Sequence, residues 1–453
     1  MGAAHGAVMW FRRDLRIVDH PALAAAAAQG PVLPLFVLDP ALLAPSGAVR
    51  VAFMLRCLRS LDRSLGGRLV VRAGDPTSIV PALAAGRPVF ASADFGPYGA
   101  RRDEVVGRRA DLHLVGSPYA VDPGTLRTTT GTGYRVFGPF QRAWRQVPLA
   151  APQPAPADLV LDDSVDGDPL PAEPEVDATL PPAGESAALD ALERFAAVVS
   201  GYATARDRPD LDATSRLSPY LRWGCVHPRQ VLARLGAGPG PDRLRTELAW
   251  REFYADVLHH RPESARTNLV RAMDGFEWDA DASADAHFDA WCQGRTGYPI
   301  VDAGMRQLLA QGWMHNRVRM IAASFLVKDL HLDWRRGARW FMAHLVDGDL
   351  ASNQHGWQWV AGTGTDPAPF FRVFNPVAQG RRFDPEGRYV RRWVPELRDV
   401  DAARVHEPWR LPGGPPAGYP PPIVDHREAR AEALRRYDAA RSRAVEWSDA
   451  VGP

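Results

Sequence analysis

Short apolar runs alternate with helical patterns from residue 7 to about residue 125, and this alternation constrains the fold more than any other feature of the chain. The apolar runs have the length of buried strands and lie at residues 7–11, 32–38, 68–74 and 88–93. Helical patterns separate them, at residues 21–29, 49–65 and 77–85. Strands that alternate with helices are typical of a parallel sheet covered by helices. We therefore predict an α/β domain over residues 1–130.

The turn after the first predicted strand has no glycine fingerprint. Neither a GxGxxG nor a Walker-type pattern follows residues 7–11. Those patterns bring the backbone close to a phosphate group in dinucleotide and P-loop sites. The predicted sheet is therefore Rossmann-like in architecture, but the sequence does not support an ordinary dinucleotide or P-loop role for it.

The composition changes sharply after this region. Residues 131–190 are rich in Pro, Ala and Asp, and no Arg or Lys occurs from Gln146 to Glu193. This composition indicates an acidic connection between domains. Strand signals nearly vanish after it, and helical patterns follow one another at residues 187–202, 241–260, 301–313, 316–330 and 425–444. We predict an all-α domain over residues 191–453.

Charge and cysteine content limit the kinds of partner and site. The formal net charge of the 453 residues is only +1, but the acidic connection concentrates negative charge, so positive charge is enriched elsewhere and a basic face is expected. The three cysteines, Cys57, Cys225 and Cys292, have no metal-ligand spacing. They are expected to be buried free thiols in a reducing compartment, and no metal site is predicted.

The sequence contains no signal for a membrane or for secretion. No apolar run is long enough to cross a bilayer, and the first residues lack the apolar segment of a secretory signal. A cytoplasmic location is expected.

Two predicted helices carry stripes that differ from ordinary core faces. Residues at 0, 3, 4 and 7 spacing share one helix face, and this spacing groups Glu247, Trp250, Arg251 and Tyr254, and also Trp313, Asn316, Arg317 and Met320. Burial of these stripes without partners would leave Arg and Asn groups unsatisfied. One such stripe also fits an amphipathic helix with partly exposed aromatic residues. Two stripes, together with the acidic, amide-rich and aromatic segment 347–366, favour a shared polar-aromatic cavity.

Hydroxyl groups surround an arginine in the segment TSRLSPYLRWG, residues 214–224. Thr214, Ser215 and Ser218 lie near a predicted helix start, where hydroxyls and backbone N–H groups suit phosphate oxygens. A simple N-cap explains the same pattern, so both interpretations stay open.

Six ordered motifs give the chain a family resemblance. They are WFRRDLR (10–16), YATARDRPDLDATSRLSPYLRWG (202–224), ELAWREFY (247–254), TGYPIVDAGMRQLLAQGWMHNRVRM (296–320), DGDLASNQHGWQW (347–359) and FRVFNP (371–376). In these motifs the chain resembles the photolyase/cryptochrome flavoproteins over nearly its whole length. The resemblance implies an N-terminal antenna-binding domain and a helical FAD-binding domain. It also implies a class I photolyase, an enzyme that uses light to repair cyclobutane pyrimidine dimers in damaged DNA, its expected partner.

The resemblance assigns cofactor contacts residue by residue. The residues implied to hold FAD are Tyr202, Thr214, Ser215, Arg216, Leu217, Ser218, Arg251, Trp313, Arg319, Asp347, Gly348, Asp349 and Asn353. Among these, Asn353 is implied to face flavin N5. Plant-type cryptochromes usually carry an acid there, so the neutral amide favours a photolyase that works with fully reduced flavin.

The resemblance also assigns a lesion pocket and an electron relay. The residues implied to contact the dimer or DNA are Arg206, Glu247, Trp250, Tyr254, Asn316, Arg317, Met320 and Trp359, and the implied relay is Trp278, Trp334 and Trp357. Glu247 and Asn316 would meet the imide edges of the dimer. Relatives that repair 6-4 photoproducts usually have His at the position of Asn316. His355 departs from the family, which often has Gly there, and we interpret it as a packing or capping residue.

The resemblance leaves the antenna and the signalling alternative open. An 8-hydroxy-5-deazaflavin is favoured over 5,10-methenyltetrahydrofolate, with Phe36, Leu38, Arg50 and Asp94 as contacts. An empty antenna pocket, FMN or a second FAD are the alternatives. A cryptochrome-type photoreceptor without repair is the alternative function. The protein is expected to be a monomer.

Overall fold

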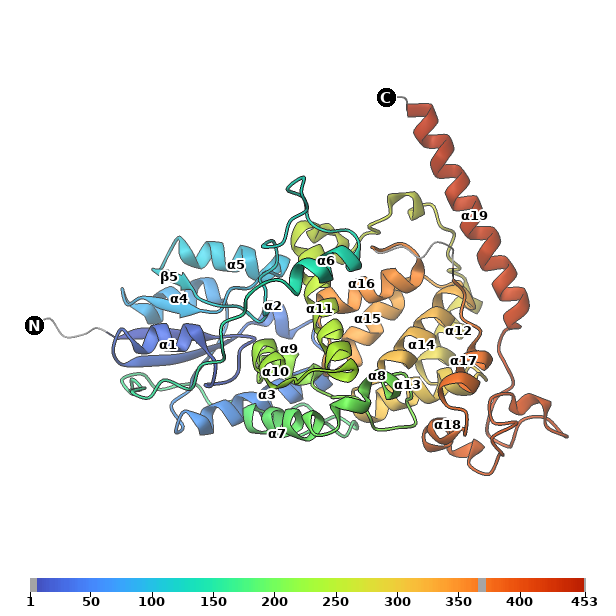
Figure 1. Cartoon of the computed structure of the whole chain (residues 1–453), viewed down its shortest axis with the longest axis horizontal. Coiled ribbons are helices and arrows are strands. Elements are labelled where there is room, and N and C mark those ends of the chain that lie inside the picture. The colour runs from blue at the N-terminus through green and yellow to red at the C-terminus, as the bar shows by residue number, and fades with distance from the viewer. Residues whose placement is uncertain (1–5, 366–371, 452–453) are drawn as a thin grey trace, which may run out of the picture.

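The computed structural model describes residues 6–365 and 372–451 (Figure 1). Residues 1–5, Asp366 at the end of the aromatic segment and Phe371 of the FRVFNP motif lie outside the described residues. No described helix has both the length and the apolar character required to cross a membrane.

The N-terminal domain is built on a five-stranded parallel sheet, which confirms the predicted α/β class. Its strand order is β3-β2-β1-β4-β5. The bounds are β1 (Ala7–Phe11), β2 (Val32–Leu38), β3 (Val70–Ala73), β4 (Val89–Ala91) and β5 (Leu112–Leu114). The four predicted strands are present, and β5 is an additional edge strand. The sequence did not reveal β5 because its three residues are largely exposed.

Helices cover both faces of this sheet, because alternate residues of each strand point to opposite sides. Met9 and Phe11 of β1 belong to one core cluster, whereas Val8 and Trp10 belong to another on the opposite face. The helices of this domain are α1 (Pro21–Ala27), α2 (Pro40–Leu43), α3 (Ala48–Ser64), α4 (Pro76–Ala84) and α5 (Pro97–Gly107). The helices α1 and α3 lie in the cluster of Met9, and α4 and α5 lie in the cluster of Trp10.

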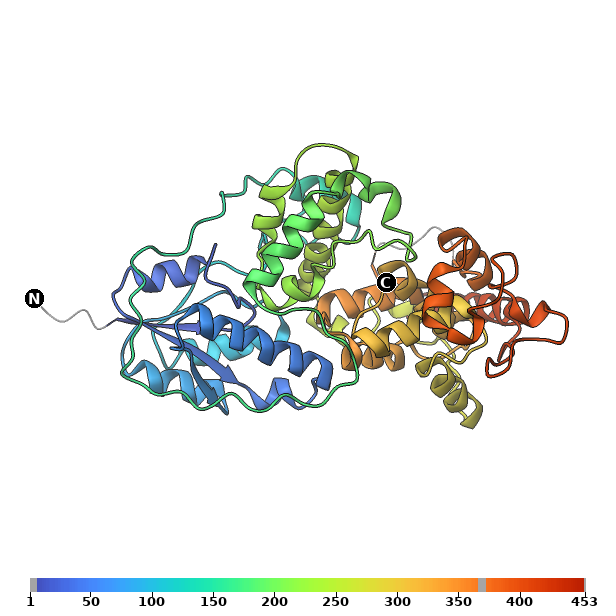
Figure 2. The same cartoon turned by 90° about the horizontal axis from the view of Figure 1, so that it is seen from below.

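The acidic connection is attached to the α/β domain along its length (Figure 2). Val32 N–H donates to Val160 O at 2.9 Å, so the connection pairs with the start of β2. Arg56 Nε lies 2.8 Å from Glu173 Oε2, and Arg72 Nη1 lies 3.2 Å from Asp168 Oδ1. The negative charge that the sequence concentrates here therefore meets arginines of the first domain. The first part of the connection contains α6 (Phe137–Trp144), which packs on a helix of the second domain.

The C-terminal half is helical, as predicted. Its elements are α7 (Glu185–Ala196), η1 (Val199–Gly201), α8 (Tyr202–Ala205), α9 (Ser218–Trp223), α10 (Pro228–Arg234), α11 (Pro239–His260), η2 (Pro262–Ala265), η3 (Arg271–Met273), α12 (Ala282–Cys292), α13 (Pro299–Gln311), α14 (Asn316–Lys328), α15 (Trp334–His344), α16 (Leu350–Ala361), α17 (Pro376–Phe383), α18 (Arg388–Trp393), η4 (Pro395–Leu397), η5 (Pro408–Arg410) and α19 (His426–Val451). The long helix α19 extends away from the rest of the molecule (Figure 1).

Most of the described helices of the helical half pack into two large hydrophobic clusters, and the site lies between the two groups of helices. Helices α7 to α11 share a cluster with one face of the sheet, so this group continues the core of the first domain. Helices α12 to α18 enclose a second cluster of their own. Figure 2 shows these two groups side by side. The domain boundaries predicted from composition stay predictions, since the first core crosses them.

Candidate functional site

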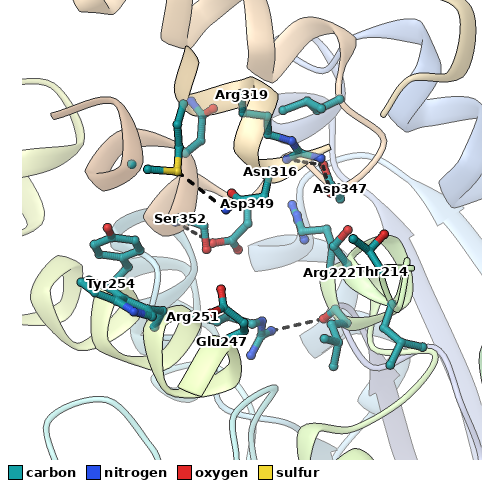
Figure 3. A pocket seen from close by; sticks show the side chains of 18 of the residues that line it. Thr214, Arg222, Glu247, Arg251, Tyr254, Asn316, Arg319, Asp347, Asp349 and Ser352 are labelled. Atoms are coloured by element: carbon teal, nitrogen blue, oxygen red, sulfur yellow. Dashed lines mark hydrogen bonds and ion pairs between the residues drawn. The ribbon is translucent and has the colours of Figure 1, made fainter. Parts of the chain in front are cut away.

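A cavity of about 540 Å³ lies between the two groups of helices (Figure 3). This volume is in the range of cofactor and substrate pockets. Helices α9 and α11 supply one wall, and α14 and α16 supply the other. Every residue assigned from the sequence to the cofactor or to the lesion lines this cavity. Of the assigned relay, Trp357 lines the cavity, whereas Trp278 and Trp334 do not.

Helix α11 shows why a helical period could locate this wall. Glu247, Trp250, Arg251 and Tyr254 follow the 0, 3, 4, 7 spacing and face the cavity. Phe253, on the adjacent face, is fully buried in the core. The stripe of polar and aromatic residues is therefore a cavity wall rather than a partly exposed helix face. The second stripe, on and before α14, reaches the same cavity from the opposite side.

The segment before α16 holds two carboxylates in fixed positions. Asp349 caps α16 by accepting the Ser352 N–H at 3.0 Å, which aims its carboxylate along the cavity wall. Asp347 accepts two hydrogen bonds from the Arg319 guanidinium, at 2.9 and 3.2 Å. Arg319 Nε donates to Met314 O at 2.7 Å, so the guanidinium is held at three points.

Trp357 and Trp359 point in different directions. They are two positions apart on α16, and this spacing turns one side chain about 200° around the helix axis from the other. Trp357 is 3% exposed and packs edge-on against Phe341, with ring centroids 5.0 Å apart, and against Trp291 at 6.1 Å. Trp359 is half-buried at the opposite part of the cavity wall. One indole thus lies toward the protein core and the other toward the open side.

Arginines gather around Asp349 at the floor of the cavity. Arg13, which follows β1, donates to Asp349 Oδ2 at 2.7 Å. Burial alone raises the pKa of a carboxyl group, but Arg13, Arg222 and Arg251 outweigh it and hold the pKa of Asp349 well below its usual range. Burial and the nearby Arg13 lower the pKa of Arg222 to about 9. The cluster therefore carries more positive than negative charge.

Four buried donor atoms of the cavity wall have no hydrogen-bond partner among the described residues, namely Nε of Arg206, Nη1 of Arg222, Nε of Arg317 and Nε1 of Trp357. Buried donors of this kind are normally satisfied, so a missing partner points to a ligand. An anionic, ring-containing ligand fits the surplus of arginines and the indole donor. FAD has both a diphosphate and fused rings, so the residues present fit this cofactor.

Asn353 is oriented by one backbone carbonyl and one side-chain amide oxygen. Its Nδ2 donates to Ala338 O at 3.1 Å and to Gln354 Oε1 at 2.9 Å. Gln354 Nε2 in turn donates to Ala265 O at 2.6 Å, which fixes the orientation of that amide. A carbonyl can only accept, so the amide nitrogen of Asn353 is committed to the protein. Its Oδ1 is the atom left to accept a hydrogen bond from the cavity.

Ion pairs surround Glu247 and the polar groups near it in the cavity. Glu247 lies 3.2 Å from Arg206 and 3.1 Å from Arg243. Burial raises the pKa of Glu247, and Arg206 opposes this effect. On the facing helix Arg317 pairs with Asp207 at 3.0 Å. These charges form a basic rim beside the carboxyl group of Glu247.

The remaining assigned tryptophans lie in the protein interior or near its edge. Trp334 is fully buried, and its Nε1 donates to Asn268 Oδ1 at 3.0 Å. Trp278 is partly buried and packs on Phe276, with ring centroids 4.3 Å apart. Among the described residues, the aromatic rings in contact with Trp357 are Phe341 and Trp291 rather than Trp278 or Trp334. The relay stays a prediction.

The four residues assigned to an antenna contact are buried or have hydrogen-bond or ion-pair partners within the protein. Phe36 and Leu38 are buried in β2. Arg50 donates to Met342 O at 2.8 Å and so faces the helical half. Asp94 accepts from Gly96 N–H at 3.0 Å and pairs with Arg102. Their role in holding an antenna stays a prediction.

His355 is a packing residue in this structure. It is fully buried, its Nδ1 lies 2.9 Å from Ala351 O, and its Nε2 lies 2.9 Å from Ser264 Oγ. Its ring is stacked under Tyr254 at 5.6 Å. Both ring nitrogens therefore have partners within the protein, which leaves neither for catalysis.

Sequence reasoning missed several residues of the cavity wall. They include Arg222, Arg243, Phe341, Ser352 and Gly356. Arg222 lies four residues after Ser218 on α9, and Arg243 lies four residues before Glu247 on α11, so the helical period already used for other residues could have found both. Helical spacing could not identify Arg13, because this residue follows a strand of the other domain.

Comparison with known proteins agrees with this architecture. Residues 7–157 match the family model for DNA photolyase, and residues 244–439 match the FAD binding domain of DNA photolyase. The deoxyribodipyrimidine photo-lyase of Halobacterium salinarum is 42% identical, and the match covers 96% of this chain and 99% of that protein. The crystal structure of a bacterial class III photolyase from Agrobacterium tumefaciens is 38% identical and superimposes with a TM-score of 0.90, covering 96% of this chain and 98% of that one.

A second solved structure that this chain resembles comes from an archaeon. The crystal structure of the photolyase from Sulfolobus tokodaii contains two FAD molecules, is 31% identical and has a TM-score of 0.86, covering 96% of this chain and 100% of that one. The matches extend over both domains and over the helices that line the cavity. This chain belongs to the DNA photolyase family.

Proposed function

We propose that this protein is a light-dependent DNA-repair enzyme that splits cyclobutane pyrimidine dimers, with FAD bound in the cavity between the two helix groups. The observation that carries the proposal is that the residues assigned to FAD and the residues assigned to the lesion line one and the same cavity. Arg319, Asp347 and Asn353 come from α14, the segment before α16 and α16, and Glu247 and Trp250 come from α11. A cofactor and a lesion would therefore occupy the same enclosed space, within reach of each other.

The lesion side has the groups that a flipped pyrimidine dimer requires. Trp250 and Trp359 offer two flat apolar faces, and stacking on an aromatic side chain is worth roughly 1–3 kcal/mol per base. Glu247 and Asn316 offer hydrogen-bonding groups for the imide edges of the bases. Arg206, Arg243 and Arg317 at the rim suit the phosphates on either side of the lesion.

The cofactor side has groups that would bind and orient FAD. The arginines around Asp349 would meet its diphosphate, and the Thr214–Ser218 run would contribute hydroxyls just before α9. Reduced FAD, when bound and excited by light, supplies the electron that opens the cyclobutane ring. The Arg319–Asp347 pair holds a positive group at a fixed place beside the rings, and Asn353 presents Oδ1 to them.

The class and antenna rest on the sequence motifs. We propose a class I enzyme with a deazaflavin antenna, and folate and a second FAD are the alternatives. The absorption spectrum of protein purified from its native host distinguishes the three chromophores. A spectrum of one FAD alone would contradict an antenna of any kind. The cytoplasmic location and monomeric state stay predictions.

The test of the function is direct illumination. FAD-loaded, chemically reduced protein is mixed with a thymine-dimer oligonucleotide and exposed to blue light, and the recovery of thymine absorbance is followed. We expect recovery in the light, none in the dark, and a strong loss with Glu247→Ala. The absence of light-dependent recovery by the wild type would overturn the proposal and favour a cryptochrome-type photoreceptor.

A further inference from the structure

Trp250, the proposed stacking wall for the lesion, is itself stacked on a phenylalanine from a distant part of the chain. The rings of Phe137 and Trp250 are nearly parallel, at 8°, with centroids 3.6 Å apart. Phe137 begins α6, in the first part of the acidic connection, and none of the six motifs that carry the family resemblance includes it. The stack therefore joins α6 to the face of α11 that lines the cavity.

Phe137 lies on the core side of the Trp250 indole. It meets Phe253 at 5.8 Å in an edge-to-face contact, and Phe253 is 0% exposed. Phe137 itself is only 7% exposed. Trp250 is partly buried and lines the cavity, and its ring also contacts Phe253 and Tyr254, with centroids 5.7 and 5.4 Å apart. Phe137 thus covers one face of the indole from the core side, while part of the indole borders the cavity.

The helix that carries Phe137 is firmly attached to α11. Gln141 Nε2 donates to Thr246 Oγ1 at 2.8 Å, one turn before Trp250. Trp144 Nε1 donates to Glu252 Oε2 at 2.6 Å, on the buried side of the same helix. Glu252 also accepts from two backbone N–H groups, of Ala120 and Val121. These contacts hold α6 along α11, so the ring of Phe137 cannot follow a rotation of the indole.

We propose that Phe137 is a positioning residue for lesion binding, and that it holds the Trp250 indole in the one orientation that presents a flat face to the extruded dimer. The proposal rests on the function proposed above. An indole that is already ordered loses little rotamer freedom when a base stacks on it, so the bound state costs less. Loss of the aromatic partner should weaken dimer binding roughly fivefold, within the range expected for one immobilised side chain.

Phe140 provides a matched control for a purely structural role. It lies on the same helix, is 2% exposed and contacts the same Phe253, with centroids 5.2 Å apart. The aromatic rings in contact with Phe140 are Phe253 and Tyr134 rather than Trp250. Phe140→Leu therefore removes a buried ring from α6 without removing the partner of the indole.

The experiment compares Phe137→Leu, Phe137→Tyr and Phe140→Leu in the FAD-loaded protein. The measurements are the dissociation constants for a thymine-dimer oligonucleotide and for the undamaged oligonucleotide, the repair rate at saturating DNA, the FAD content and the melting temperature. We expect Phe137→Leu to weaken binding of the dimer about fivefold, with little change for undamaged DNA or for the rate at saturation. Phe137→Tyr keeps the ring and should bind as the wild type does. Phe140→Leu should lower the melting temperature but leave the affinity for the dimer oligonucleotide unchanged.

A double-mutant cycle separates positioning from general loss of packing. In a Trp250→Ala background, Phe137→Leu should have no further effect on dimer affinity, because the indole that it orients is gone. Equal effects of Phe137→Leu and Phe140→Leu on dimer affinity, or an effect that persists without Trp250, would overturn the inference. A wild-type protein that does not prefer dimer-containing DNA would instead overturn the proposed function.

Discussion

Arg13 and Asp349 form an ion pair of 2.7 Å that joins the α/β domain to the cofactor end of the cavity. Arg13 is the second residue after the end of β1, and Asp349 is the N-cap of α16. Their side chains are 21% and 14% exposed. The sheet domain therefore contributes directly to the electrostatics of a site that otherwise belongs to the helical domain.

Loss of this pair should affect both stability and cofactor retention. Arg13→Ala leaves the Asp349 carboxylate largely buried without its nearest cation, and we expect the free energy of unfolding to fall by about 2–3 kcal/mol, somewhat less than for a fully buried pair. FAD affinity should fall as well, which equilibrium dialysis measures. Arg108→Ala breaks an exposed pair with Glu104 and should cost less than about 1 kcal/mol. Equal effects of the two variants would contradict this role for Arg13.

The amide of Asn353 should control the redox behaviour of the cofactor. Asn353→Asp replaces the donor to Ala338 O by an acceptor and adds a negative charge at the cavity wall. We expect the bound flavin to become harder to reduce fully, as a redox titration followed by absorbance would measure. Gln354→Glu adds the same charge one residue away, outside the cavity wall, and should shift the potential much less. A potential unaffected by Asn353→Asp would place the rings elsewhere.

The predicted relay requires Trp334 for photoreduction of the flavin but not for repair. Trp334→Phe removes the indole that donates to Asn268, and we expect photoreduction of the oxidised flavin to be blocked. Repair by chemically reduced enzyme should be preserved, because that reaction needs no electron from the protein. Trp409→Phe, in the same helical domain but outside the relay, is the control. Unchanged photoreduction in Trp334→Phe would show that the route through Trp334 is wrong.

Arg206 should contribute to DNA affinity through charge rather than through recognition of the lesion. We expect Arg206→Ala to weaken binding to damaged and undamaged DNA by similar factors, and to reduce the salt dependence by about one phosphate contact. Binding titrations at several salt concentrations measure this slope. Arg234→Ala, an exposed arginine paired with Glu193, should leave it unchanged. A loss restricted to damaged DNA would instead assign Arg206 to the lesion itself.

His355 should make the fold sensitive to acid. Burial lowers the pKa of His355 to about 4, below the ordinary value of about 6.5 for an unfolded chain. The folded state thus holds the neutral ring, and stability is lost as the pH falls from about 6.5 toward 4. This loss amounts to roughly 2 kcal/mol between pH 7 and pH 5.

The variant His355→Gln removes this titration and should narrow the difference in melting temperature between pH 7 and pH 5. The comparison of the two pH values within each protein cancels the packing cost of the substitution. His113→Gln, at an exposed histidine on β5, should keep the wild-type difference. The same difference in all three proteins would exclude His355 as its source.

Local spacing was sufficient to find the two helix faces of the cavity wall, and the family resemblance supplied most of the other assigned residues. Glu247, Trp250, Arg251 and Tyr254 could be grouped because a helix places every third or fourth residue on one face. The opposite directions of Trp357 and Trp359 followed from the same geometry. The strand at Leu112–Leu114 escaped prediction because its residues are largely exposed, whereas the equally short strand Val89–Ala91 is buried and apolar and was found.

The sequence by itself determined the order of strands and helices, the division into a sheet domain and a helical domain, and the residues on each helix face, because these depend on neighbours a few positions apart. Only the tertiary structure decided which distant residues meet. It stacks Phe137 on Trp250, pairs Arg13 with Asp349, and brings Cys57 and Cys225 to 3.6 Å between their sulfur atoms in the shared core. Such contacts depend on how whole elements pack, and side-chain periodicity contains no information about the partner across a packed interface.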